Sequence, residues 1–196
     1  MKKLGILISG GGSNLQAIMD ACAFGVLKGK AEVAAVISNK KDAYGLQRAV
    51  KNNIPAVFID RKIYPDAGAF CGEIKKRLTE HKVDLVCLAG FLLKLEPSLT
   101  GSFKIINIHP ALLPRHGGKG MYGHFVHEAV IKAGEKESGA TVHWVDEQYD
   151  HGGAIIQQKV PVFSNDTPET LAERVLEVEH ELYPKAILKI ITGANS

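Results

Sequence analysis

The sequence has few of the residues that mark several specialised protein classes. Its 196 residues include only three cysteines, Cys22, Cys71 and Cys87, whose spacing fits neither a disulfide framework nor a zinc site. No apolar run is long enough to cross a bilayer, and the formal net charge of +3 is too small for a nucleic-acid surface. We therefore expect reduced thiols, no membrane and no nucleic-acid partner. Because no signal peptide follows the start of the chain, we also expect a cytoplasmic protein.

Apolar runs instead alternate regularly with amphipathic segments. Runs rich in Val, Ile and Leu predict strands at 4–9, 33–38, 56–60, 83–89 and 105–109. Apolar residues at helical spacing predict helices over 14–22, 43–52 and 67–81. This order predicts an α/β fold with an open, doubly wound, mainly parallel sheet, helices on both faces and a Rossmann-like N-terminal half.

The pattern changes after residue 110. A glycine-rich loop at 117–123 leads to a predicted helix near 124–133, a β-rich stretch at 140–162 with hairpin-like pairing, and a long helix that starts around 165–169 and continues to about 191. No linker or repeat interrupts the chain. We expect one domain over 1–196, with a Rossmann-like half (1–110) and a second half (111–196) that carries the later loops and the C-terminal helix.

The stretch Asn107-Ile108-His109-Pro110 at the end of a predicted strand is the most informative local pattern. Residues i and i+2 of a strand project from one face, so Asn107 and His109 can converge on one small group. An amide can donate to a carbonyl oxygen that gains negative charge, and an imidazole can exchange a proton near neutral pH. The pair is typical of half an acyl-transfer site. The alternative is a strand end with a buried structural histidine.

A triple-glycine turn, Ser9-Gly10-Gly11-Gly12-Ser13-Asn14, joins the first predicted strand to the first predicted helix. Glycines let the backbone approach a ligand, and free amides at a helix start attract an anion. The turn is not GxGxxG and has no Walker lysine, so it favours a phosphate over a dinucleotide or a triphosphate. The alternative is a plain tight turn with Ser13 as the helix cap.

The acidic loop at 146–153 lies between two strand-like segments and contains Asp150 before a glycine pair. Such a loop can carry a catalytic side chain, and Asp150 can orient the imidazole of His109 and raise its pKa. The alternative is a turn aspartate bonded to its own backbone.

The eight histidines of the chain show no metal-ligand spacing. His124 and His127 lie three residues apart without the HExxH order, so we expect both to be exposed helix residues. His143 alternates with Val142 and Trp144 in a predicted strand, and we expect it to face the sheet rather than a pocket.

Taken in order, these elements resemble the folate-dependent glycinamide ribonucleotide formyltransferase family of purine synthesis. The resemblance covers nearly the whole chain. It rests on five motifs, which occupy 8–17 (ISGGGSNLQA), 88–91 (LAGF), 107–114 (NIHPALLP), 139–145 (GATVHWV) and 150–157 (DHGGAIIQ). The run 174–184, with Glu179 and His180 before Tyr183 and Pro184, also matches a late helix of the family.

The resemblance implies transfer of a formyl group from 10-formyltetrahydrofolate to the amine of glycinamide ribonucleotide. The products would be formylglycinamide ribonucleotide and tetrahydrofolate. The implied catalytic residues are Asn107, His109 and Asp150, with Asp150 keeping His109 cationic. The implied ribonucleotide contacts are Gly12, Ser13, Asn14, Pro110 and Glu179, and the implied folate contacts are Leu92, Leu93, Lys94, Leu95 and Asn107. No metal is required, the partners are small molecules, and the chain would be a monomer or a weak homodimer.

This sequence departs from the family pattern in two regions. Many relatives place an arginine where Leu93 stands and another where 67–68 fall, and both would meet the folate glutamate tail; Lys94 or Arg61 is the available replacement here. The loop at 114–122 is longer than in the shortest members, and its glycine-rich part predicts a mobile lid.

Three other functions fit parts of the pattern. Formyltransferases acting on initiator tRNA and formyltetrahydrofolate hydrolases share the Asn-x-His and Asp core, but they carry a further domain for which we expect no room in this chain. A non-catalytic phosphate-binding module would explain the glycine turn and leave Asn107, His109 and Asp150 without a joint role. A metal-dependent hydrolase is the third alternative.

Overall fold

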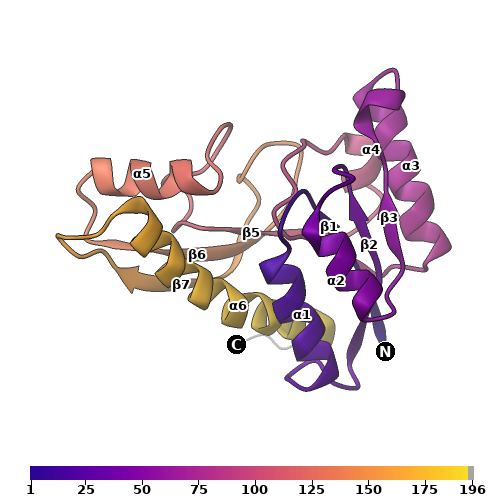
Figure 1. Cartoon of the computed structure of the whole chain (residues 1–196), viewed down its shortest axis with the longest axis horizontal. Helices are drawn as coiled ribbons and strands as arrows, with labels where there is room; N and C mark the ends of the chain where they lie inside the picture. The colour runs from indigo at the N-terminus through magenta and orange to yellow at the C-terminus, as the bar shows by residue number, and fades with distance from the viewer. Residues whose placement is uncertain (194–196) are drawn as a thin grey trace.

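The computed structural model describes residues 1–193, which form a seven-stranded sheet of order β3-β2-β1-β4-β5-β6-β7 (Figure 1). The strands are β1 (Lys2–Ile8), β2 (Ala31–Ser38), β3 (Ala56–Phe58), β4 (Leu85–Leu88), β5 (Ile105–His109), β6 (Glu137–Trp144) and β7 (Ala154–Pro161). Strands β1 to β5 pair in parallel, whereas β6 and β7 are antiparallel to their neighbours. The predicted α/β fold class is confirmed.

Helices follow the strands as the apolar spacing predicted. Within 1–193 they are α1 (Ser13–Ala23), α2 (Tyr44–Lys51), α3 (Ala67–Glu80), α4 (Pro97–Thr100), α5 (His124–Lys132) and α6 (Pro168–Thr192), together with a short 3-10 helix at Arg61–Ile63. The sequence did not predict α4 or the 3-10 helix, because neither is long enough to show a periodicity. None of the helices in this part of the chain is both long and apolar enough to span a membrane.

The two faces of the sheet are covered by different helices. Side chains from α1, α2, α5 and α6 pack in one apolar cluster, and side chains from α3 and α4 pack in another. The first cluster includes residues on both sides of position 110, from Leu4 on β1 to Ile187 on α6. The strands alternate between the clusters: Ile105 of β5 belongs to the second, whereas Ile106 and Ile108 belong to the first.

The loops after β1, β4 and β5 meet at the carboxyl edge of the parallel strands, where open α/β sheets bind ligands. The N–H of Ser9 after β1 donates to the carbonyl of Gly90 after β4 (3.0 Å). Next to them, antiparallel β6 places His143 opposite Asn107 and Thr141 opposite His109. Side chains from two neighbouring strands therefore project into one region.

Helix α6 closes this region from the face that it covers. It starts at a capping box made by Thr167 and Thr170. Its fully buried Tyr183 donates a hydrogen bond to the carbonyl of Leu88 at the end of β4 (2.9 Å). Glu179 lies one turn earlier, on the same side of the helix, and this docking turns it toward α1.

Candidate active site

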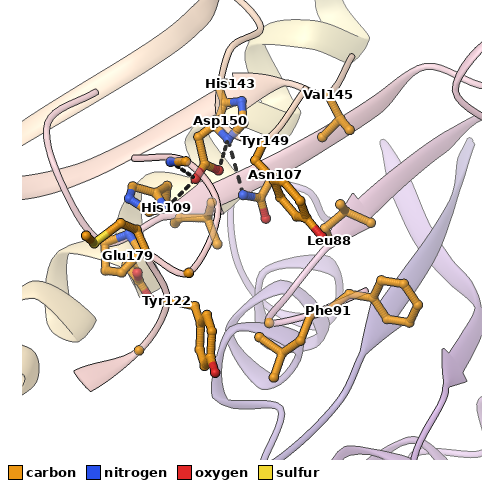
Figure 2. Close-up of a pocket in the computed structure, with 18 of the residues that line it drawn as sticks. Leu88, Phe91, Asn107, His109, Tyr122, His143, Val145, Tyr149, Asp150 and Glu179 are labelled. Carbon is orange, nitrogen blue, oxygen red and sulfur yellow. Dashed lines mark hydrogen bonds and ion pairs between the residues drawn. The ribbon is translucent and has the colours of Figure 1, made fainter. Parts of the chain in front are cut away.

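A cavity of about 950 Å³ lies at the carboxyl edge of the sheet, between the loops after β4 and β5 and helices α5 and α6 (Figure 2). A smaller pocket of about 340 Å³ adjoins it, since Asn14, Gly90 and Glu179 line both. The larger cavity is lined by Leu92, Leu93, Lys94, Leu95, Asn107, His109, Pro110 and Asp150, and the smaller pocket by Gly12 and Ser13. The candidate site residues predicted from the sequence therefore line two adjoining pockets.

His109 and Asp150 lie against each other inside the larger cavity. The Nδ1 atom of His109 is 3.5 Å from Oδ2 of Asp150, and the His109 side chain is 4% exposed. On the other edge of the ring, Nε2 lies 2.8 Å from the carbonyl oxygen of His116. Because a carbonyl oxygen can only accept, Nε2 carries a proton in this arrangement.

Asp150 raises the pKa of His109 as expected, but this effect is too small to keep the imidazole cationic in the protein without substrate. Burial lowers the pKa of the imidazole below its usual value, and the charge of Asp150 and the hydrogen bond to His116 only partly offset that effect. The free energy lost by removing the charged imidazole from water is larger than the free energy gained from one carboxylate at 3.5 Å. His109 is therefore mostly neutral near pH 7.

Asp150 is held by three neighbours rather than by its own backbone. Its Oδ2 accepts a hydrogen bond from the N–H of Gly118 (2.9 Å), and its Oδ1 lies 3.5 Å from Nε2 of His143. Burial favours the protonated acid, but His143 and His109 in their protonated forms, together with the Gly118 N–H, outweigh it and lower the pKa of Asp150 below its usual value. The residue has φ 54°, a left-handed conformation that Asp tolerates better than most residues.

The expectation that His143 faces the sheet rather than a pocket is wrong. Its side chain is 2% exposed and lines the larger cavity. The distance between its Nε2 and Nδ2 of Asn107 is 3.1 Å (Figure 2). Its Nδ1 lies 2.8 Å from the carbonyl of Trp144 and so carries the proton of the neutral ring. Nε2 is then free to accept from the Asn107 amide, which leaves the second amide N–H of Asn107 for a ligand.

Both helix histidines were expected to be exposed, and this expectation is wrong for His127. His124 is half exposed and pairs with Glu128, as expected of a surface residue. His127 is 4% exposed, lines the larger cavity and has no partner for its Nδ1 in residues 1–193. Burial lowers the pKa of its imidazole to about 4. Val126 and Val130 are buried on the same helix, and that spacing was the signal that could have placed His127 inward.

The triple-glycine turn forms the floor of the smaller pocket. Gly12 caps α1 in a left-handed conformation (φ 72°), and no side chain caps this helix, so Ser13 is not the cap that the alternative required. The Nδ2 of Asn14 donates to Oε2 of Glu179 (2.7 Å), and the Oδ1 of Asn14 has no partner in residues 1–193. Burial raises the pKa of Glu179 to about 7.

Comparison with known proteins shows which family the chain belongs to. The model of the family described as formyl transferase matches residues 2–187. The chain belongs to the formyl transferase family. The resemblance identified from the five sequence motifs is confirmed.

Relatives are similar to this chain along almost all of its length. A protein named phosphoribosylglycinamide formyltransferase from Haemophilus influenzae is 43% identical over 95% of the chain and 86% of its own length. The chloroplastic protein of that name from Arabidopsis thaliana is 45% identical over 95% of the chain and 64% of its own length. The chain spans 14% of the trifunctional purine biosynthetic protein adenosine-3 of Chironomus tentans, at 42% identity over 98% of the chain.

Solved structures of the formyl transferase family share the fold described above. Glycinamide ribonucleotide transformylase 1 from Symbiobacterium toebii superposes with a TM-score of 0.91 at 41% identity, covering 98% of this chain and 89% of that one. The phosphoribosylglycinamide formyltransferase structure from Coxiella burnetii gives a TM-score of 0.89 at 39% identity, over 98% and 88%.

The segment 92–95 of this chain runs along the larger cavity without regular secondary structure. The N–H of Leu92 donates to the Ser9 hydroxyl (3.1 Å), which in turn donates to Oδ1 of Asn39 (2.6 Å). Lys94 is exposed at the cavity. Arg61 does not line it, because its guanidinium donates to the carbonyl of Tyr64 (3.0 Å) and lies 5.9 Å from the Phe70 ring. Of the two basic residues considered for the folate tail, the structure places Lys94 at the cavity.

Proposed function

We propose that this chain transfers the formyl group of 10-formyltetrahydrofolate to the amine of glycinamide ribonucleotide in purine synthesis. The observation that carries the proposal is the meeting of Asn107, His109 and Asp150 in a cavity that continues into the glycine-lined pocket. Two relatives are named phosphoribosylglycinamide formyltransferase, which supports transfer of a formyl group to this acceptor.

The ribonucleotide would occupy the smaller pocket and the passage between the two cavities. Its phosphate would lie on the turn formed by Gly12, Ser13 and Asn14, where backbone N–H groups at the start of α1 favour an anion. Glu179 lines both cavities and would accept hydrogen bonds from the sugar hydroxyls. Pro110 lines the larger cavity and would border the glycinamide, whose amine then reaches toward Asn107.

The formyl folate would occupy the larger cavity. The backbone of Leu92, Leu93, Lys94 and Leu95 would run along the pterin, with Lys94 near the glutamate tail. The formyl group would then lie at Asn107, between the pterin strip and the ribonucleotide.

The arrangement supports acyl transfer without a covalent enzyme intermediate. The substrate amine forms a bond to the formyl carbon, whose oxygen gains negative charge, and the free N–H of Asn107 would donate to that oxygen. A developing anion beside His109 favours the charged imidazole, so His109 would bind a proton and deliver it there. Asp150, through water, would take the proton that the amine loses. Collapse then restores the carbonyl and breaks the bond to N10 of the folate: the hydroxyl proton returns to His109, and the proton held by Asp150 passes through water to N10.

The direct test is an assay with 10-formyltetrahydrofolate and glycinamide ribonucleotide, run beside a control that offers only water as acceptor. Formylglycinamide ribonucleotide as the product supports the proposal, whereas formate in both reactions would show a hydrolase. Titration with a folate analogue adds a binding measurement, since a phosphate-binding module should not respond. Turnover that persists in EDTA would eliminate the metal-dependent hydrolase.

A further inference from the structure

Arg48 is the basic residue of the smaller pocket, and the sequence pattern did not single it out. In the described part of the chain, this pocket is lined by Gly10, Gly11, Gly12, Ser13, Asn14, Tyr44, Arg48, Ala89, Gly90, Leu176 and Glu179. Among these residues Arg48 carries the positive side chain and Glu179 the acidic one. A pocket built from neutral donors and a carboxyl group would otherwise offer a phosphate no full positive charge.

Helix α2 reaches the glycine turn because two glycines let the backbones touch. The N–H of Gly45 at the start of α2 donates to the carbonyl of Gly10 (3.1 Å). A Cβ atom at Gly12 would lie 2.9 Å from the Cα of Gly45, and a Cβ at Gly45 would overlap the side chain of Ile8. Arg48 lies three residues after Gly45, on the same face of α2, and therefore also faces the turn.

The guanidinium of Arg48 is fixed on two sides. Its Nε donates to the carbonyl of Gly11 (2.9 Å), and its Nη1 donates to Oε1 of Gln16 (3.1 Å). Its Cζ lies 4.9 Å from the centre of the Tyr44 ring, a stacking distance. Within residues 1–193, Arg48 makes no ion pair and its Nη2 has no hydrogen-bond acceptor, so its charge and at least two N–H groups remain available.

The same contacts orient the turn. The carbonyl and the next N–H of a trans peptide point in opposite directions, so holding the carbonyls of Gly10 and Gly11 against α2 turns the N–H groups of Gly11 and Gly12 away from it. Neither N–H has a partner within residues 1–193. A second, independent feature lies beside them: Asn14 is only 9% exposed, and its Oδ1 is unpartnered. The pocket therefore presents unsatisfied polar groups to a ligand.

We propose that Arg48, held by Gly11 and stacked on Tyr44, is the residue through which this protein recognises the charge of the phosphate on its sugar substrate. This inference rests on the proposed function and adds to it the cation of the phosphate subsite. Arg48 is a binding and positioning residue, because the reacting carbon lies in the other cavity. Its guanidinium supplies the charge, whereas the turn supplies neutral N–H donors.

The test compares the ribonucleotide with its dephosphorylated riboside in wild type and in Arg48→Ala. Loss of a charged hydrogen bond should raise KM for glycinamide ribonucleotide about 10- to 100-fold. The KM for the riboside, already weak in wild type, should change little, because it lacks the group that Arg48 recognises. Lys51→Ala is the matched control: it removes a cation from the same helix that lies 5.7 Å from the same Tyr44 ring, and it should change neither KM.

The alternative is that Arg48 only holds the glycine turn in shape. In that case Arg48→Ala would weaken the riboside and the ribonucleotide by the same factor, and this result would overturn the inference. Arg48→Lys and Arg48→Gln repeat the comparison with a smaller perturbation, which matters if the alanine variant does not fold. The lysine variant keeps the charge and should retain most of the preference for phosphate, and the glutamine variant should lose it.

A binding measurement separates this inference from the proposed function. Calorimetric titration with ribose 5-phosphate and with ribose needs no turnover. Tight binding of the phosphate ester to wild type and its loss in Arg48→Gln would support the role of Arg48 even if no formyl transfer occurred. Formyl transfer that proceeds normally in Arg48→Gln would leave the proposed function intact and refute the role of Arg48.

Discussion

The carboxylate of Asp150 accepts a hydrogen bond from the backbone N–H of Gly118 at 2.9 Å. Gly118 belongs to the glycine-rich loop that lines the larger cavity, and two residues earlier the carbonyl of His116 is 2.8 Å from Nε2 of His109. The loop expected to act as a lid therefore also contacts two of the three proposed catalytic side chains. Its position and the orientation of these side chains are coupled.

Shortening this loop should reduce turnover without unfolding the protein. Deletion of 119–121 would pull on Gly118 and displace the donor to Asp150, and misplaced groups of this kind cost about tenfold to a hundredfold in rate. Steady-state kinetics with circular dichroism would measure both effects. Lys119→Ala, which keeps the loop length, should retain far more activity, and full activity of the deletion would end the lid hypothesis.

His109→Ala and Asp150→Asn should each lower kcat by about two to four orders of magnitude, the usual contribution of acid–base catalysis. Both residues lie away from the glycine turn, so the affinity for the ribonucleotide should change little. Rapid-quench kinetics and equilibrium titration would separate the two quantities. A variant with near-normal turnover would show that the proposed catalytic roles are wrong.

His143→Ala should lower kcat while KM for either substrate stays nearly constant. The imidazole accepts from the Asn107 amide and approaches Asp150, so its loss frees both groups to rotate. We expect a loss of about tenfold to a hundredfold, smaller than for removal of an oxyanion donor itself. His151→Ala is a suitable control because His151 is 65% exposed and pairs with Asp146. Equal effects of the two substitutions would contradict the positioning role.

Glu179 should make stability depend on pH. Its pKa is about 7 in the folded protein and 4.5 for a glutamate in water, so between these values the folded state binds a proton that the unfolded state has lost. The stabilisation is complete below pH 4.5 and is lost as the pH rises to about 7. In Glu179→Gln this loss, about 3 kcal/mol in the free energy of unfolding, should be absent.

Urea unfolding of wild type and Glu179→Gln at several pH values between 4.5 and 8 would measure the difference. Exposed Glu177 on the same helix provides the control, since Glu177→Gln should leave the pH dependence of wild type unchanged. Parallel curves for wild type and Glu179→Gln would show that Glu179 ionises in the folded protein as it does in water.

The parallel part of the fold could be predicted because each buried strand is a continuous apolar run and each covering helix shows a clear period. The meeting of Asn107 with His109 followed from strand geometry alone. The approach of His143 did not, because alternation shows which residues share a face but not which strand lies alongside. The strand beside His143 is β5, and its Asn107 lies 36 residues before His143 in the sequence.

Burial and long-range docking explain the remaining differences. The pKa of His109 depends on how completely the fold removes water from the ring, and no local pattern gives that quantity. Arg48 appears in the sequence as an ordinary helix cation, and only the packing of α2 on the glycine turn brings it to the pocket. The roles assigned to the individual site residues stay predictions until the variants are measured.

Asp150 lies on the connection between β6 and β7, outside the paired strands. One residue gained or lost in that connection would carry the carboxylate away from the imidazoles while every strand stayed paired and the apolar layers stayed filled. Chemistry and architecture can thus be inherited separately on this scaffold. A variant with an altered hairpin tip should therefore lose the proposed catalysis and keep the pocket proposed for the sugar phosphate.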